Sequence, residues 1–198
     1  MVDPEKWVNP LRGYAYDSFN KDALLRLAKV EDGRMTLPGG VSYKVLVVPL
    51  PRPMNPEQAE LSPEVEKKIN ELKKAGILIP DLPYTGDDFS AYGLERDLIV
   101  PEDVAWTHRR GEQGDIYFIA NQREETRTFT ASMRIYGRKP ECWNPLTGEI
   151  DFRPSYEQKN NRTEVTLTLA PNESVFIVYP TEKNCFGDEK SLQKQQKE

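Results

Sequence analysis

The sequence predicts two modules, a small α/β lobe followed by an antiparallel β-sandwich. Three patterns lead to this fold class. The first part of the chain contains one strand, one helix and one strand in that order, which is the arrangement that joins parallel strands. From Val104 onward, apolar and polar residues alternate in short runs with frequent turns, as in β-sandwiches. Between these parts, residues 81–103 lack clear periodicity and indicate a linker loop.

The start of the chain predicts an entry segment, a short helix and a hairpin. Residues 1–20 are broken by prolines and a glycine, and aromatic side chains supply anchors there. Asn20 is a suitable N-cap for a helix over residues 21–28, whose leucines form one apolar face. Asp32 and Gly33 lie between two short β-prone pieces, and this pair favours a tight hairpin turn.

A strand–helix–strand unit follows. Residues 43–49 form an apolar run, typical of a strand that is buried on both faces of a parallel sheet. Ser62 and Pro63 predict the start of a helix, and Gly76 suits the left-handed position just after its end. Residues 77–79 then form a second short buried strand, so the crossover is expected to be right-handed.

The second half of the chain predicts the strands of the sandwich. Residues 126–137 alternate well, with Phe129 and Met133 on the same face. Turns rich in glycine, proline and asparagine separate this run from its neighbours. The predicted organisation is a lobe with its entry segment over 1–80, a linker loop over 81–103, a sandwich over 104–180 and a disordered polar tail over 181–198.

The composition excludes several classes of function. The chain has 198 residues and a formal net charge of −5, which argues against nucleic-acid binding because that requires a basic surface. A single histidine rules out a multi-histidine metal site, and neither the cysteines nor the glycines have the spacing of a zinc site or a phosphate-binding loop. We therefore expect no metal, no cofactor and no nucleic-acid partner.

Hydropathy gives no sign of a membrane segment. The most apolar run, residues 45–50, is far too short to span a bilayer. The N-terminus has no apolar stretch of signal-peptide length, and the cysteines do not indicate an oxidising compartment. We expect no membrane partner, and the sequence leaves the cellular compartment of the chain undecided.

The densest cluster of functional groups surrounds the single histidine. Strand alternation places Trp106 and His108 on one face and Arg109 on the other. Asp115 lies across the predicted hairpin, within reach of an arginine. Two interpretations stay open: a core tryptophan with cross-strand ion pairs, or a surface that faces a sugar or another domain. Trp143 can likewise stack on a sugar ring or serve as an anchor in the core.

No pair of carboxylates stands out as catalytic. Glycoside hydrolysis needs two carboxyl groups across a cleft, one of them with a raised pKa. The adjacent acids at positions 87–88 and 124–125 lie in apparent loops, without the apolar surroundings that would raise a pKa. We interpret them as solvated surface, and no catalytic residue is assigned.

Several segments, taken in order, resemble the C-terminal part of bacterial α-L-rhamnosidase-like enzymes, glycoside hydrolase family 106. The most specific is Val104–Gln122, with the sequence VAWTHRRGEQGDIYFIANQ. The others are residues 16–25, 32–49, 61–65, 74–76, 88–97, 127–132 and 141–148. The similarity extends over about residues 14–180, nearly the whole chain, and the order of the segments makes the resemblance strong.

The resemblance implies a particular architecture and role. It implies that the α/β lobe is an abbreviated flavodoxin- or amidotransferase-like domain, and that a catalytic barrel preceding this region carries the catalytic carboxylates and a calcium site. The chain is then a non-catalytic C-terminal region, a truncated or split product or a fragment, that packs against the barrel and shapes the rim of its sugar site. Its partners are that barrel and rhamnose-containing polysaccharide, in a parent enzyme that is periplasmic or exported.

Two alternatives stay open. In the first, the sandwich is a carbohydrate-binding module that holds a polysaccharide through Trp106, Trp143 or the loop over residues 84–92. In the second, the chain is a structural or oligomerisation module that needs no sugar.

Overall fold

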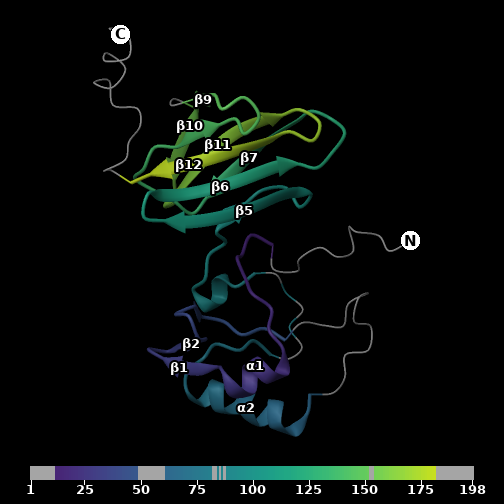
Figure 1. Cartoon of the computed structure of the whole chain (residues 1–198), viewed down its shortest axis with the longest axis vertical. Helices are drawn as coiled ribbons and strands as arrows, with labels where there is room; N and C mark the ends of the chain where they lie inside the picture. Colours follow the sequence, from purple (N-terminus) through teal and green to yellow (C-terminus); the bar gives the residue numbers. More distant parts are fainter. Residues whose placement is uncertain are drawn as a thin grey trace. The chain divides into compact units, whose positions relative to one another are not determined.

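The computed structural model describes residues 12–48, 61–81, 84, 86, 88–151 and 154–181. Within these residues the chain forms two compact units, one from residues 16–94 and one from residues 12–15 and 95–181 (Figure 1). We call them the N-terminal unit and the sandwich. The start of the predicted entry segment and nearly all of the predicted polar tail lie outside the described residues. None of the described helices is long and apolar enough to cross a membrane.

The N-terminal unit begins with the expected helix and hairpin. Helix α1 (Lys21–Arg26) starts where Asn20 Oδ1 accepts a hydrogen bond from the Ala23 amide at 2.9 Å, so the predicted N-cap is confirmed. Strands β1 (Lys29–Glu31) and β2 (Arg34–Thr36) pair across Asp32 and Gly33. Both turn residues have positive φ, as the favoured two-residue hairpin turn requires, and the hairpin prediction is confirmed.

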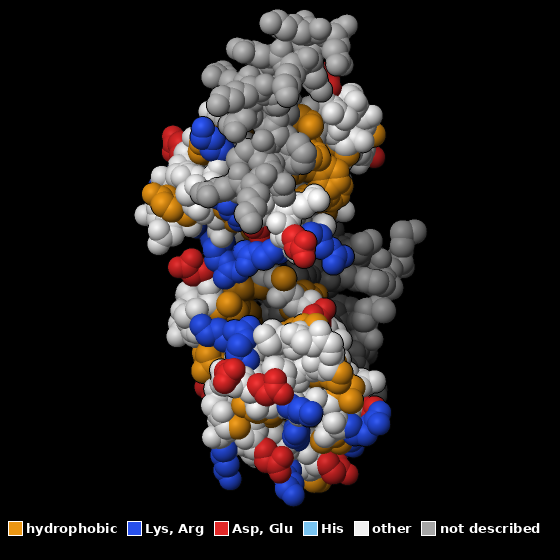
Figure 2. Space-filling model, turned by 60° about the vertical axis from the view of Figure 1, so that its left-hand side comes forward, with side chains coloured by type: hydrophobic (Ala, Val, Ile, Leu, Met, Phe, Trp, Pro, Cys, Tyr) orange, Lys and Arg blue, Asp and Glu red, His pale blue; other side chains and the backbone are white. Residues whose placement is uncertain are grey.

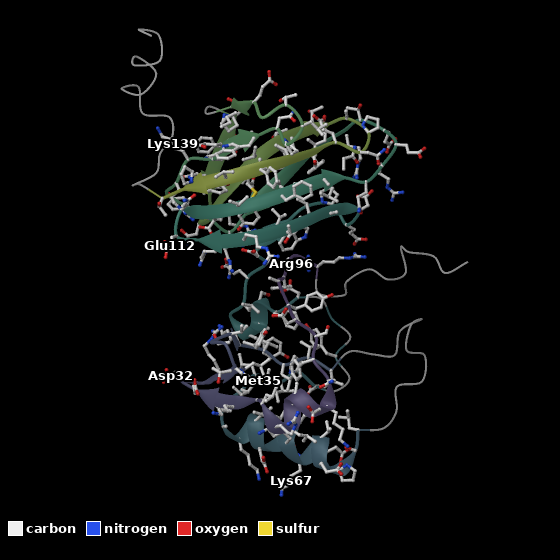
Figure 3. The ribbon with its side chains drawn as sticks, viewed as in Figure 1. Asp32, Met35, Lys67, Arg96, Glu112 and Lys139 are labelled. Carbon is white, nitrogen blue, oxygen red and sulfur yellow. The ribbon has the colours of Figure 1, made fainter. Side chains whose placement is uncertain are left out.

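Helix α2 (Pro63–Lys74) has the predicted start and end. Proline occupies its first turn, where no amide is needed for the helix. At the other end Gly76 has a φ of 91°, its amide donates to the Lys73 carbonyl and the Ile77 amide donates to the Leu72 carbonyl. These two bonds form a Schellman motif that ends the helix at the predicted glycine. The buried face of α2 packs in a core with α1 and β2, around Met35 (Figure 3).

The predicted pair of buried parallel strands is reduced to a single bridge. Val45 and Leu78 form one parallel bridge, with the Leu46 amide donating to the Leu78 carbonyl at 3.0 Å. The start of the predicted strand 43–49 pairs elsewhere, because β3 (Ser42–Tyr43) runs antiparallel to β2. Because Tyr43 pairs with β2, few residues of the apolar run 43–49 are left to form a parallel ladder. The described part of this unit therefore does not show a flavodoxin-like parallel sheet.

The sandwich confirms the predicted all-β module. A four-stranded sheet has the order β10-β11-β7-β4, and a five-stranded sheet has the order β5-β6-β12-β8-β9. Each neighbouring pair is antiparallel. The strands are β4 (Leu98–Ile99), β5 (Val104–Gly111), β6 (Gly114–Asn121), β7 (Arg127–Met133), β8 (Glu141–Trp143), β9 (Ile150–Asp151), β10 (Tyr156–Lys159), β11 (Arg162–Leu169) and β12 (Ser174–Pro180).

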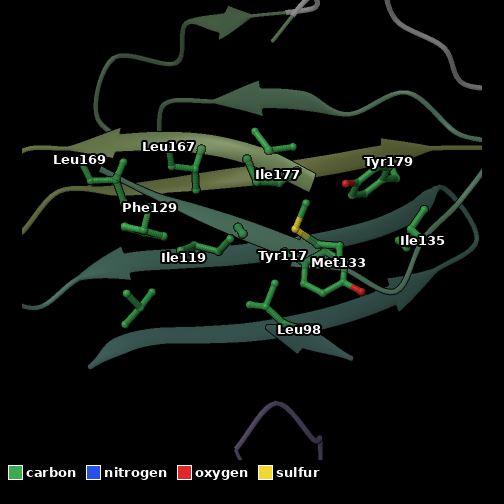
Figure 4. Packing of buried hydrophobic residues seen from close by; sticks show 13 residues of the cluster. Leu98, Tyr117, Ile119, Phe129, Met133, Ile135, Leu167, Leu169, Ile177 and Tyr179 are labelled. Carbon is green, nitrogen blue, oxygen red and sulfur yellow. The ribbon is translucent and has the colours of Figure 1, made fainter. Parts of the chain in front are cut away.

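The core of the sandwich comes from alternate residues of both sheets. Phe129 and Met133 of β7 face Ile119 of β6 and Ile177 of β12, and all four side chains are buried (Figure 4). This is the alternation that the sequence predicts for residues 126–137. Because every second residue of the long strands points inward, burial of this apolar layer is the main force that holds the two sheets together.

The division between the units lies between Leu94 and Glu95, inside the predicted linker 81–103. That segment contains part of the sandwich, since β4 pairs with β7 and forms an edge of the four-stranded sheet. The Asp97 amide donates to the Gly13 carbonyl at 2.7 Å, so residues 12–15 lie along the same edge. The other sheet has β5 at its edge.

The hairpin between β5 and β6 gives a test of the fold. Gly114 has a φ of 145°, and a Cβ there would overlap the Tyr179 carbonyl on β12. Gly111, at the other end of the same turn, has no atom within 4 Å of the corresponding position. We predict that Gly114→Ala lowers the free energy of unfolding by about 2 kcal/mol or more.

The matched variant Gly111→Ala should leave stability unchanged or raise it slightly, because it only restricts the unfolded chain. Urea unfolding followed by tryptophan fluorescence measures both. Equal effects of the two substitutions would contradict the close approach at Gly114.

Candidate functional site

The site is built on the hairpin of β5 and β6. In its register His108 lies opposite Tyr117, and Arg110 lies opposite Asp115. All four residues belong to the inward-facing set of their strands, which also contains Val104 and Ile119 of the core. The turn of the hairpin carries Glu112, and Arg96 immediately precedes Asp97 ahead of β4 (Figure 3). The histidine is therefore directed between the edge strands of the two sheets.

His108 is held between two buried carboxylates. Its Nδ1 is 2.6 Å from Oδ2 of Asp97, and its Nε2 is 2.9 Å from Oδ1 of Asp115. The imidazole ring stacks on Tyr117, with centroids 4.0 Å apart and planes 6° from parallel. An ionised carboxylate only accepts hydrogen bonds, so both contacts are made when both ring nitrogens carry a proton. Each ring nitrogen thus lies within hydrogen-bonding distance of a carboxylate oxygen.

Arginines complete the neutralisation of both carboxylates. The Arg110 Nε donates to Asp115 Oδ1 at 2.8 Å, and Arg138 donates to the other oxygen of Asp115. On the opposite side of the ring, the Tyr117 hydroxyl donates to Asp97 Oδ1 at 3.1 Å, and Arg134 lies 3.5 Å from the same oxygen. Each of the four carboxylate oxygens therefore has at least one partner.

Arg162 of β11 fixes the stretch of chain that carries Asp97. Its guanidinium donates to the carbonyl oxygens of Arg96 at 2.7 Å and of Ser132 at 2.6 Å. Partial burial lowers the pKa of Arg162, and this is the largest influence on it. Asp97 is consequently placed by its backbone as well as by its carboxylate.

The pKa values of the two carboxyl groups show that their hydrogen-bond and charge partners outweigh the effect of burial. Burial has the largest single effect and would raise the pKa of Asp115, but the bonds from Arg138, Arg110 and His108 together lower it below its usual value. For Asp97, burial is again the largest influence, and His108, Arg134 and Tyr117 outweigh it, so its pKa is also lowered. The Tyr117 hydroxyl has a raised pKa, mainly through burial and then through the charge of Asp97.

This arrangement joins the two sheets. His108 belongs to the edge strand of the five-stranded sheet, whereas Asp97 immediately precedes the edge strand of the four-stranded sheet. Because β4 has only two residues, it gives this end of the core little apolar cover. We call His108, Asp97 and Asp115 the edge clasp. Among the described residues, no group of three His, Cys, Asp or Glu side chains is arranged to hold a metal ion.

The other predicted residues lie elsewhere in the sandwich. Trp106 is directed inward and packs against the core, half-buried. Arg109 lies on the opposite face of β5 and is exposed. Trp143 lies on β8 beside Phe176 of β12, and its indole donates to Glu141 at 2.9 Å. The structure thus brings together His108 and Asp115, but neither tryptophan contacts the clasp in any described interaction.

Sequence reasoning missed Asp97, Arg134 and Arg138. Asp97 lies in the segment taken as a linker, and the two arginines follow β7, far from His108 along the chain. The available signal was His108 itself, since a histidine on an inward face needs hydrogen-bond partners for its ring nitrogens. Which residues supply them depends on the contact between sheets, and strand alternation does not reveal that contact.

Removing one carboxylate tests the clasp. We predict that Asp115→Asn lowers the free energy of unfolding at pH 7 by about 3 kcal/mol, because His108, Arg110 and Arg138 lose their shared counter-charge. The lowered pKa of Asp115 contributes stability above about pH 4 that is lost as the pH falls through the folded-state value. The variant should therefore have a flatter stability curve below pH 4, as measured by urea unfolding across a pH series.

Asp22→Asn is the matched control. Asp22 also pairs with an arginine, Arg26, but on the exposed surface of α1. This substitution should change stability little, because exposed ion pairs are weak. Equal effects of the two substitutions would show that the clasp is no stronger than a surface pair.

One family model and two known proteins match most of this chain. The family model described as alpha-L-rhamnosidase, glycoside hydrolase family 106, matches residues 4–86 and 84–158. A protein of Formosa agariphila named "Putative beta-glucuronidase" is 26% identical over 219 residues, which cover 91% of this chain and 18% of that protein. The structure of a rhamnosidase from Novosphingobium sp. PP1Y matches with a TM-score of 0.67 and 22% identity, over 84% of this chain and 20% of the other.

The chain thus spans about a fifth of the length of each relative. At 22% identity the likeness to the solved rhamnosidase shows the fold alone, and it supports the arrangement of sheets described above. The family match covers most of the chain and confirms the resemblance seen in the sequence. The chain belongs to glycoside hydrolase family 106, the α-L-rhamnosidase family.

Proposed function

We propose that this chain is a non-catalytic region of an α-L-rhamnosidase-like glycoside hydrolase, and that it supports the part of the enzyme that cleaves rhamnose-containing glycans. One observation carries the proposal. The most concentrated group of ionisable side chains in the sandwich is fully engaged in holding its two sheets together. This cluster therefore has no carboxylate available for hydrolysis.

The chemistry of glycoside cleavage makes the argument specific. A general acid must keep its proton near neutral pH, and this requires a raised pKa. Asp97 and Asp115 instead have lowered pKa values, and His108 occupies the space between them where a scissile bond would have to lie. Where the pKa of another described carboxyl group departs from its usual value, it is also lowered, as at Asp22, Glu64 and Asp103.

The two outer faces of the sandwich support a role in contact with other parts of an enzyme. On the five-stranded sheet, Phe118, Phe176 and Trp143 lie side by side across β6, β12 and β8. The Phe118 and Phe176 rings are 5.1 Å apart. By contrast, the outer face of the other sheet carries exposed threonines, with Thr128 and Thr168 hydrogen-bonded at 2.9 Å. The aromatic face is the one suited to contact a further domain or the rim of a sugar site.

The share of each relative that this chain covers fits the proposal. About four-fifths of each relative lies outside the matched region, enough for a separate catalytic domain. A catalytic barrel in that remainder is what the family resemblance implies. The chain then contributes its aromatic face and the hairpin of β5 and β6 to a larger assembly.

The experiment is a hydrolysis assay on the purified chain. We predict no release of the aryl group from an aryl α-L-rhamnoside above the rate of a buffer blank. Asp97→Asn and Asp115→Asn should lower stability without changing this rate. Hydrolysis that one carboxylate substitution abolishes, while circular dichroism shows the variant still folded, would overturn the proposal.

A further inference from the structure

The chain leaves the sandwich and returns to it at neighbouring points. Residues 12–15 belong to the sandwich, residues 16–94 form the N-terminal unit, and the chain returns to the sandwich at Glu95. Because the Asp97 amide donates to the Gly13 carbonyl at 2.7 Å, the outgoing and returning segments lie side by side. The N-terminal unit is therefore an insertion into the sandwich, attached by two adjacent chain crossings. We call residues 12–15 the strap.

The strap lies against the residues that lead into β4. Gly13 has a φ of 81°, and a Cβ there would lie 2.5 Å from the Leu98 carbonyl oxygen, so the two backbones approach each other closely. Tyr14 is buried, and the Arg96 guanidinium lies 5.9 Å from the centre of its ring. Because the strap has only four residues, it can open locally while the apolar core of the sandwich stays closed.

Asp97 joins the strap to the edge clasp. Its amide binds the strap at Gly13, whereas its carboxylate lies 2.6 Å from His108 Nδ1 and accepts a hydrogen bond from the Tyr117 hydroxyl. Its carbonyl accepts a further hydrogen bond from the Arg134 amide at 2.9 Å. The strap and the histidine thus hold the same residue, one through its main chain and the other through its side chain. A change at either partner can therefore reach the other through Asp97.

The clasp lies at a polar edge of the sandwich. Arg110 and Arg134, which contact the carboxylates of the clasp, are 71% and 43% exposed. Figure 2 shows Lys and Arg side chains gathered along the edge of the sandwich where Figure 1 places β5. Opening at such an edge exposes less apolar surface than opening the core between the sheets, so it costs less free energy.

We propose that Asp97 acts as a latch for the strap. While His108 holds the Asp97 carboxylate, the strap is bound to the sandwich, and loss of that contact releases the strap although the sandwich stays folded. A bound strap keeps the two chain crossings together. A released strap leaves the N-terminal unit held at one crossing, between Leu94 and Glu95, so that unit gains freedom of motion. The proposed function does not require this device, and the inference does not depend on it.

The test follows exchange of the Asp97 amide proton with solvent, measured by NMR on the full chain. This proton exchanges when the hydrogen bond to Gly13 opens. His108→Phe keeps an aromatic ring to stack on Tyr117 but removes the contact with the Asp97 carboxylate. We predict exchange at least about tenfold faster in this variant, the effect of losing one hydrogen bond to a charged group.

Leu169→Ala is the matched control for a general loss of stability. Leu169 lies in the core at the end of β11 opposite Arg162, so this variant lowers global stability without touching the clasp or the strap. It should leave the Asp97 amide at the wild-type exchange rate, because the strap opens while the rest of the sandwich stays folded. The amides of β11 should instead exchange faster.

Gly13→Ala tests the latch from the side of the strap. Its methyl group would overlap the Leu98 carbonyl, so the strap should stay open and the Asp97 amide should exchange about tenfold faster or more. Adding His108→Phe to this variant should then cause no further change at that amide. Gly40→Ala is the matched control and should leave exchange unchanged, since Gly40 has a similar φ of 83° but no atom within 4 Å of the corresponding position.

Backbone NMR relaxation checks the consequence for the N-terminal unit. Helix α2 should tumble with a shorter correlation time in His108→Phe than in the wild-type chain. An Asp97 amide that keeps its wild-type exchange rate in His108→Phe, or that exchanges equally fast in His108→Phe and Leu169→Ala, would overturn the latch. If Gly13→Ala does not fold, the comparison of these two variants still decides. Unchanged tumbling of α2 would overturn the release of the N-terminal unit.

Discussion

One edge of the sandwich depends on a single imidazole ring held between two carboxylates. His108 links β5, at the edge of one sheet, to Asp97, at the start of the edge strand of the other. Apolar packing between the sheets is non-directional, so it draws the sheets together without fixing the register of their edges. The histidine, its two aspartates and the arginines around them supply directed contacts at the edge where β4 is too short to cover the core. Burying these charges is costly, and it is sustained only because each carboxylate is bonded on both oxygens.

The same interaction connects fold with function. Functional groups at this density are often found in active sites, but here the carboxylates are neutralised and their pKa values are lowered. The Arg110 and Arg134 side chains that contact these carboxylates are 71% and 43% exposed. The aromatic row of Phe118, Phe176 and Trp143 lies on a different face, so the two features can serve different contacts.

Sequence patterns correctly predicted the features that depend only on interactions between neighbouring residues. The cap at Asn20, the hairpin turn at Asp32 and the helix end at Gly76 depend on a few neighbouring residues, and all are present. Alternation also placed Trp106 and His108 on one inward face. Of the parallel strand pair predicted from residues 43–49, the structure has one bridge. An apolar run indicates burial but does not determine which strand it pairs with.

The candidate site was only half predictable for the same reason. Asp115 lies opposite Arg110 in the hairpin, so spacing alone brings it near His108. Asp97 comes from a segment without periodicity and reaches His108 only because the two sheets face each other at that edge. Arg134 and Arg138 follow β7, and they too contact the aspartates of the clasp only because of how the sheets pack. Contacts between sheets are set by the topology of the whole module, which a single sequence does not display.

The most direct measurement is a double-mutant cycle across the two sheets. His108→Phe keeps an aromatic ring to stack on Tyr117, and Asp97→Asn keeps the shape of the side chain without its charge. The free energies of unfolding of both single variants and the double variant give the coupling between the residues at pH 7. If the histidine clasps the two sheets, the coupling is about 1 kcal/mol or more, as for residues in direct contact. Effects that simply add, within about 0.5 kcal/mol, would contradict this account.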